Sequence, residues 1–417
     1  MSNKLREFFM TKLEKYAKLI ISKGVNIQPG QKLLIRCPVN LAYFSRVLTQ
    51  LAWEAGAADV FTIWSDEETD RIRYLHAPDD VFGQIPKWVN RQIKYIVDNG
   101  YNVVNIYSID PESLKDVSSE RISKDLTALS RTNKPLTDQL ITNAIQWCLI
   151  GVPNSAWAKK VFPDAATEEE AIAKMWEAIY HAARVDDHDP IENWNKHIAH
   201  LTTQADKLMK HNFSSLTFKN SLGTDLTVTL PQGHIWVSCG EIASTGHAFV
   251  ANIPTEEVFT APHRAGTNGI VYASKPLTYM GNIIDQFWIK FKNGQAIEWD
   301  AEIGKEFLDK LITTHPNADY LGEVALVPSE SPISQSGILW YNTLFDENAS
   351  CHLALGRGYD FNLSGTANKS QDELMDMGLN QSLEHTDFMI GSADLSITGV
   401  SQTGEIIQVF KDGEWAL

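Results

Sequence analysis

Apolar residues near the start of the chain recur every three or four positions, the spacing of an amphipathic helix. These positions are Phe9, Leu13, Tyr16, Ala17, Ile20 and Ile21. Gly24 ends the run, and residues 28–31 read as a turn. The extended apolar segments 32–37 and 59–64 then flank a helical stretch at 43–55. A strand, a helix and a second strand joined by short connections predict a right-handed parallel unit.

The pattern continues as an α/β layer up to an acidic segment. Residues 101–107 and 144–150 read as further strands, and residues 168–185 read as a helix. No G-x-G-x-x-G follows the first strand and no Walker motif occurs, so nothing favours nucleotide binding. We read the acidic segment 186–190 as a solvated linker rather than a metal site. Residues 1–188 are therefore predicted to form an α/β N-terminal domain with a parallel sheet.

The second half has a different pattern of predicted elements. A long helix is predicted at 194–210, and short β-type runs separated by turn residues follow it. These runs are residues 216–218, 226–230, 234–237, 270–272, 287–291 and 396–400. Such spacing predicts a mostly antiparallel sheet or a partial barrel. Residues 189–417 are therefore predicted to form an α+β C-terminal domain, and this domain carries the candidate metal site described below.

Composition narrows the class of protein. The 417 residues are 43% hydrophobic and include 12 Trp and 17 Phe, enough for two domains with large cores. A formal charge of −16 argues against nucleic acid and anionic membranes as partners. The four cysteines follow no metal or disulfide spacing, and we see neither a signal peptide nor an apolar span. We therefore expect a cytoplasmic protein.

Ionisable residues interrupt the apolar runs between residues 321 and 390. They are Glu323, Glu347, His352, His385 and Asp387. In an extended strand, the His-x-Asp spacing sends His385 and Asp387 to the same face. Burying isolated charges is costly, so each needs a cation, a hydrogen-bond donor or a metal. Taken singly, a glutamate at a strand start usually reaches solvent and a strand histidine is usually a core residue, but five such residues together indicate a metal site.

The segment 252–262, NIPTEEVFTAP, adds a further carboxylate. Two prolines stiffen the loop that presents Glu256 and Glu257. The combined set is too rich in carboxylates for a structural zinc site, which prefers thiolates. It suits two hydrolytic metal ions roughly 3.5–4 Å apart that share a carboxylate and a water.

At these residues the chain resembles the metallo-aminopeptidase family that includes aminopeptidase T, aminopeptidase S and PepS. The resemblance extends over essentially the whole chain. It is carried by the segment 24–31 (GVNIQPGQ), the segment 252–262, and the segment HTDFMIG that begins at His385.

The resemblance implies a set of site residues. The metal ligands it implies are Glu257, Glu323, His352, His385 and Asp387, with Glu323 as the bridge between two divalent ions per subunit. Zinc or cobalt is expected, with manganese or magnesium as alternatives. Glu347 is implied as a further ligand or as the general base, and Tyr359 as a donor to the tetrahedral oxyanion.

The activity implied by the resemblance is removal of the N-terminal residue from peptides with a free N-terminus, through attack by a metal-bridging water. A homodimer is implied as well. Two alternatives stay open on the residues alone: a dimetal hydrolase of other amides or esters, and a metal-binding or peptide-binding protein that is not an enzyme. His247, His263 and Arg264 lie near the Glu257 loop in sequence and could line the cleft or lie at the surface.

Overall fold

The computed structural model describes residues 11–185 and 188–417. The predicted helix position Phe9 and the first two residues of the predicted acidic linker, Asp186 and Asp187, lie outside the described residues. Within the described part, the first helical segment begins at Lys12 and continues as a short π-helix to Gly24, where the amphipathic pattern predicted an end.

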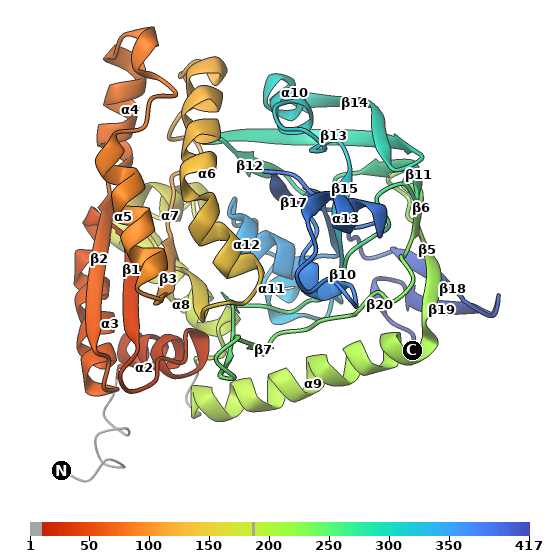
Figure 1. The fold of residues 1–417 in the computed structure, drawn as a ribbon, viewed down its shortest axis with the longest axis horizontal. Helices are drawn as coiled ribbons and strands as arrows, with labels where there is room; N and C mark the ends of the chain where they lie inside the picture. The colour runs from red at the N-terminus through yellow and green to blue at the C-terminus, as the bar shows by residue number, and fades with distance from the viewer. Residues whose placement is uncertain (1–10, 186–187) are drawn as a thin grey trace.

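A parallel sheet forms the centre of the N-terminal half, as predicted (Figure 1). The strand order is β2-β1-β3-β4-β9, and every neighbouring pair is parallel. The strands are β1 (Lys32–Pro38), β2 (Asp59–Ser65), β3 (Tyr101–Tyr107), β4 (Trp147–Gly151) and β9 (Asn252–Ile253).

Helices cover both faces of this sheet because its strands are apolar on both sides. Leu33 and Ile35 of β1 pack on one face with α2, α3, α7 and α8, whereas Leu34 packs on the other face with α5 and α6. The helical segments here are α2 (Lys12–Leu19), η1 (Ile20–Gly24), η2 (Val39–Leu41), α3 (Ala42–Glu54), α4 (Glu67–His76), η3 (Asp79–Val81), α5 (Lys87–Asp98), α6 (Ser119–Ile141), α7 (Ser155–Val161) and α8 (Glu168–Ala182).

The two halves of the chain share a sheet and a core. Strand β9 comes from the second half, yet it pairs with β4 through Leu149 and Ile150. One cluster of buried apolar residues has members from both halves of the chain, from Tyr16 to Phe410. The predicted division at residues 188 and 189 stays a prediction.

The second half is built on antiparallel sheets, as predicted. The largest has the order β12-β13-β11-β6-β5-β18-β19-β20, with β14 paired to β13. Its strands are β5 (Phe213–Lys219), β6 (Asp225–Thr229), β11 (Thr267–Tyr272), β12 (Leu277–Tyr279), β13 (Asn282–Lys292), β14 (Gln295–Ile303), β18 (Ser396–Ser401), β19 (Ile406–Lys411) and β20 (Glu414–Trp415). The strand predicted at 234–237 is wrong: the segment follows a turn at Pro231 and Gly233 and makes only single bridges, His234 to Leu363 and Val237 to Phe259.

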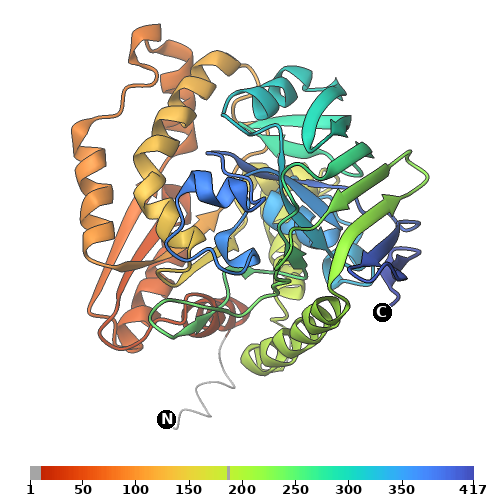
Figure 2. The same cartoon turned by 45° about the vertical axis from the view of Figure 1, so that its right-hand side comes forward.

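A smaller antiparallel sheet lies deep in the molecule, between the parallel sheet and the large antiparallel one (Figures 1 and 2). Its order is β10-β15-β16-β17, and the strands are β10 (Val258–Thr260), β15 (Leu321–Leu326), β16 (His352–Gly356) and β17 (His385–Met389). A separate hairpin pairs β7 (Glu241–Ile242) with β8 (Ala248–Phe249). The helical segments of this half are α9 (Pro190–His211), α10 (Lys305–Thr313), α11 (Pro332–Gln335), α12 (Thr343–Asp346), η4 (Glu347–Ala349), η5 (Asp360–Asn362) and α13 (Gln371–Asp376).

Among the described residues, no helix combines the length and the apolar character required to cross a membrane. All four cysteines are buried free thiols, as their irregular spacing predicted.

Candidate metal centre

The four-stranded sheet gathers the predicted ligands on one of its faces. Glu323 of β15 and Asp387 of β17 both lie opposite Ala354 of the strand between them. His352 and His385 lie two positions from these sites along their own strands, so they point to the same face. Ala354 has only a methyl group there, which leaves space between the two carboxylates. The same-face prediction for His385 and Asp387 is therefore confirmed.

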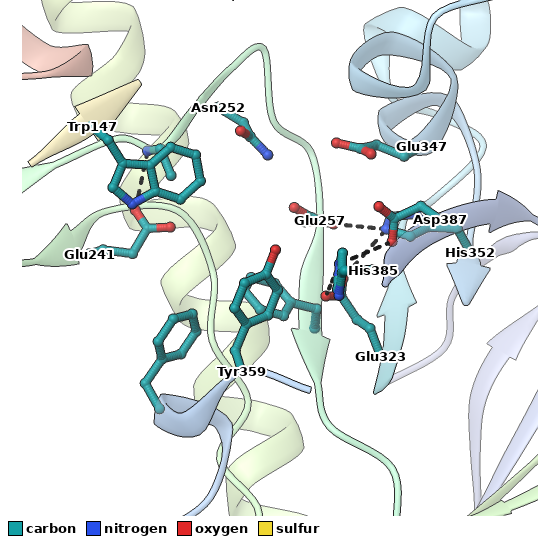
Figure 3. A pocket seen from close by; sticks show the side chains of 13 residues that line it. Trp147, Glu241, Asn252, Glu257, Glu323, Glu347, His352, Tyr359, His385 and Asp387 are labelled. Carbon is teal, nitrogen blue, oxygen red and sulfur yellow. Dashed lines mark hydrogen bonds and ion pairs between the residues drawn. The ribbon is translucent and has the colours of Figure 1, made fainter. Parts of the chain in front are cut away.

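Two groups of ligand atoms meet above this face, and Glu323 belongs to both. One group consists of Glu257, Glu323 and His352, and the other of Glu323, His385 and Asp387. In each group the ligand atoms lie within 4.8 Å of one another. The Nε2 atom of His352 is 3.0 Å from Glu257 Oε2 and 3.6 Å from Glu323 Oε1. The Nε2 atom of His385 is 3.6 Å from Glu323 Oε2 and 3.7 Å from Asp387 Oδ1 (Figure 3).

Backbone carbonyls orient both imidazole rings. His352 Nδ1 donates to the carbonyl of Ser350 at 3.1 Å, and His385 Nδ1 donates to the carbonyl of Arg357 at 2.7 Å. A carbonyl can only accept, so Nδ1 carries a proton in both rings, and Nε2 is the nitrogen that faces the carboxylates and would be free to bind a metal ion once it is deprotonated. Such hydrogen bonds fix the tautomer of a metal-binding histidine and raise its basicity.

The cluster is charged and shielded from water. Side-chain exposure is 1% for His352, 5% for Glu323 and 9% for Glu257. Burial raises the pKa of Glu323 to about 7. Burial would lower the pKa of His352, but its hydrogen bonds to Glu257 and Glu323 outweigh that effect and raise the pKa above its usual range. In addition, Asp387 Oδ1 is buried without a hydrogen-bond partner. A buried group of acids and imidazoles of this kind fits a compensating cation.

The Glu257 loop is fixed to the segment that contains Glu347. The backbone N–H of Glu256 donates to Asn348 Oδ1 at 2.7 Å. The Asn348 amide in turn donates to the Leu344 carbonyl at 2.9 Å and to Glu347 Oε1 at 3.3 Å. Asn348 is fully buried, and its side chain connects the Glu257 loop to Glu347.

Glu256 points away from the ligand cluster. Its carboxylate forms a two-pronged ion pair with Arg184, with contacts of 2.5 and 2.9 Å. His197 lies beside it and contacts the carbonyl of Thr255 at 2.7 Å. Of the two adjacent glutamates, Glu257 alone faces the metal centre, and Glu256 anchors the other side of the loop.

Glu347 and Tyr359 line the same pocket as the ligands (Figure 3). Among the described residues, Glu347 belongs to neither ligand group. Burial, together with the charges of Asp387 and Glu257, raises its pKa well above its usual range. The Tyr359 ring lies 4.8 Å from the His385 ring. Burial and then the charge of Glu323 raise the pKa of its hydroxyl, which keeps this group a hydrogen-bond donor.

Three residues proposed from sequence as possible cleft residues do not reach the pocket in the described part of the chain. Arg264 lies over the Tyr320 ring and donates to Asn317 at 3.2 Å. His263 packs against Gly378, and His247 lies in the turn of the β7–β8 hairpin.

Sequence reasoning missed other residues that form or support the pocket. Trp147, Glu241 and Asn252 form part of its wall, and Asn348 supports the Glu257 loop. Asn252 opens the quoted segment 252–262 and Asn348 follows the candidate residue Glu347, so a polar side chain beside a candidate site residue was the available signal. Glu241 stands in a turn-rich stretch and carried no such signal.

The pKa shifts predict how pH affects the metal-free protein. Glu323 and His352 both hold a proton more tightly in the folded protein than in the unfolded chain. Their contribution to stability is therefore present at low pH. The part due to Glu323 is lost as pH rises through about 7, and the part due to His352 is lost as pH rises above the usual pKa range of histidine. We expect the free energy of unfolding of chelator-treated protein to fall by about 2 kcal/mol between pH 5.5 and pH 8.5.

Urea unfolding at the two pH values measures this change. The variant Glu323→Gln, which cannot ionise at this position, should show a smaller fall. Metal-saturated protein should also show a smaller fall, because bound metal keeps the ligands deprotonated throughout. A metal-free protein that gains stability over this interval would contradict the assignment.

The chain is similar to known proteins over nearly its full length. The model of a family described as thermophilic metalloprotease (M29) matches residues 9–415. Aminopeptidase AmpS of Bacillus subtilis is 40% identical over 408 residues, which is 98% of this chain and 99% of that protein. Aminopeptidase 2 of Geobacillus stearothermophilus is 43% identical over 404 residues, or 97% of each chain.

A solved structure has the same fold. Wild-type AmpT from Thermus thermophilus superposes with a TM-score of 0.89 at 34% sequence identity. The match covers 97% of this chain and 99% of that one. The similarity therefore includes the parallel sheet, the antiparallel sheets and every strand that presents a candidate ligand.

Proposed function

Because the chain belongs to the M29 family of thermophilic metalloproteases, we propose that it is a metallo-aminopeptidase that removes the N-terminal residue of peptides. The observation that carries the proposal is the pair of ligand groups that share Glu323 in a chain similar to aminopeptidases over nearly its full length. The substrates are peptides with a free N-terminus.

Two divalent ions per subunit fit the residues present. Glu257, Glu323 and His352 would hold one ion, and Glu323, His385 and Asp387 would hold the other. The donor set contains oxygen and imidazole nitrogen and no thiolate, as in hydrolytic sites. Zinc or cobalt is the first choice and manganese or magnesium the alternative, because such ligands accept all of these ions. When bound, the ions supply Lewis acidity that activates water and polarises the scissile carbonyl.

The chain's own groups handle the proton and the developing charge. Glu347 lines the pocket from outside both ligand groups, a position suited to a general base that takes a proton from water and passes it to the leaving amine. Asn348 holds one oxygen of this carboxylate through the 3.3 Å hydrogen bond. The Tyr359 hydroxyl, kept protonated, can donate to the oxyanion that forms at the carbonyl.

A pair of peptides tests the activity. The purified protein should release the first residue of a peptide with a free N-terminus and leave the N-acetylated form of the same peptide intact. Chelation should abolish hydrolysis, and zinc, cobalt or manganese should restore it. Equal cleavage of both peptides would favour a dimetal hydrolase of other amides or esters. Hydrolysis that survives chelation would contradict the metal-dependent mechanism.

The proposal also covers the oligomeric state, the partners and the cellular compartment of the protein. We include a homodimer and a cytoplasmic location, and exclude nucleic acid as a partner because of the charge of −16. The four cysteines are free and buried, which suits a reducing compartment.

A further inference from the structure

Opposite the ligand cluster, the pocket has a second wall that the proposed mechanism does not use. This wall contains Trp147, Glu241 and Asn252 (Figure 3). Trp147 begins β4 of the parallel sheet, Glu241 begins the β7–β8 hairpin, and Asn252 begins β9. Three separate segments thus converge on one side of the pocket, with Glu257 and Tyr359 between them and the other ligands.

Glu241 is a carboxylate without a cationic partner among the described residues. Its polar contacts come from backbone N–H groups, those of Gly240, Glu241 itself and Ala251, the last at 3.4 Å. Glu256 differs, because Arg184 neutralises its charge through a two-pronged ion pair. Burial raises the pKa of Glu241 to about 7 although these backbone hydrogen bonds lower it, as expected for a buried acid without a neighbouring cation.

Asn252 presents a second unsatisfied acceptor on the same wall. Its Oδ1 atom is buried and has no hydrogen-bond partner. A buried acceptor without a partner is uncommon in folded proteins and requires an explanation. A ligand that brings its own N–H groups into the pocket would satisfy both this oxygen and the Glu241 carboxylate.

Trp147 makes this wall suitable for an organic ammonium group. The indole Nε1 donates to the carbonyl of Leu140 at 3.1 Å, so the ring is held in place by its polar edge. Phe249 packs against the ring, and the part of the ring that lines the pocket is aromatic surface of the kind that attracts ammonium groups. A carboxylate, an amide oxygen and an indole ring together match an ammonium group, which has three N–H donors and no acceptor.

We propose that Glu241 and Asn252 bind a positively charged amino group of the first residue of the substrate, against the ring of Trp147. This inference rests on the proposed aminopeptidase function, because it assumes that the scissile bond lies at the ligand cluster and the first residue extends towards Glu241. The cation is either the α-ammonium group, which every such substrate has, or the side-chain ammonium of a basic first residue. The two share one chemistry and can be separated by experiment.

The test uses the metal-loaded enzyme and two chromogenic substrates, the p-nitroanilides of norleucine and lysine. Their side chains are similar in length, but only lysine adds a second cation. For Glu241→Gln we expect KM to rise about tenfold or more, because a charge-assisted hydrogen bond is lost, while kcat changes much less. Asn252→Ala should raise KM in the same pattern by a smaller factor. Glu302→Gln, at an exposed site with the same change of charge, is the matched control and should leave both constants unchanged.

The pattern of loss decides the outcome. Equal rises in KM for both substrates assign the site to the α-ammonium, and a rise for the lysine substrate alone assigns it to the basic side chain. Metal content and thermal midpoint are measured for each variant. They distinguish weaker substrate binding from loss of the metal centre or of the fold. Constants within twofold of wild type for both substrates would overturn the inference and leave the aminopeptidase proposal intact. A wild-type enzyme that hydrolyses neither substrate would instead contradict the proposed function.

Discussion

Replacing Glu323 with glutamine is expected to lower kcat/KM for peptide hydrolysis by at least about 1,000-fold, since loss of Lewis-acid assistance costs several kcal/mol of transition-state stabilisation. Glu323 is the one residue common to both ligand groups, so its loss removes a ligand from each. Glutamine has nearly the same shape but no charge, which leaves the packing of β15 unchanged. Metal content by mass spectrometry and initial rates on a dipeptide measure the two effects together.

Two matched variants make this prediction specific. Glu257→Gln affects only the group that contains His352, and Asp387→Asn affects only the group that contains His385. Each should reduce metal content less than Glu323→Gln does. A Glu323→Gln enzyme with full metal content and activity would contradict the shared-ligand arrangement.

Replacing Glu347 with glutamine is expected to lower kcat by about 100- to 10,000-fold, the usual contribution of a general base. Metal content should stay at the wild-type level, because Glu347 lies outside both ligand groups of the described residues. The Asn348 amide can still donate to the side-chain oxygen of glutamine, so the η4 turn should keep its structure.

The Glu347→Gln variant also separates two roles that the sequence left open. Loss of kcat with full metal content assigns the residue as the general base. Loss of metal together with activity would show instead that Glu347 is a ligand. Glu302→Gln serves again as the surface control, and the thermal midpoint shows whether the variant is folded.

Local sequence pattern was sufficient to predict the features that depend on neighbouring residues only. The His-x-Asp spacing predicted a shared face for His385 and Asp387, because alternation is a property of any extended strand. The strand-helix-strand order likewise predicted the parallel sheet, because short connections leave few alternatives. These predictions needed no knowledge of distant residues.

The rest of the site depends on pairing between strands that are far apart in the sequence. Local sequence pattern does not predict such pairing. Glu257 reaches Glu323 because β10 pairs with β15, and His352 reaches both because β16 pairs with β15. Only the family resemblance linked these segments beforehand. Glu241 had no such link and was missed, because its place in the pocket depends on where the β7–β8 hairpin folds back. The strand predicted at residues 234–237 failed for a related reason: its β-type residues meet neighbours only at isolated positions.

The fifth strand of the parallel sheet limits how such a chain could arise from separate genes. β9 belongs to the second half in sequence but completes a sheet whose other strands all end by Gly151. A gene fragment that encodes residues 189–417 would carry every residue proposed for the metal centre, yet its product would lack the β4 edge that holds β9 just ahead of Glu257. Recombination that exchanged the first half would have to preserve that edge. We therefore expect the two halves to be inherited as a unit, with catalytic competence lost in any chimera whose β4 cannot receive β9.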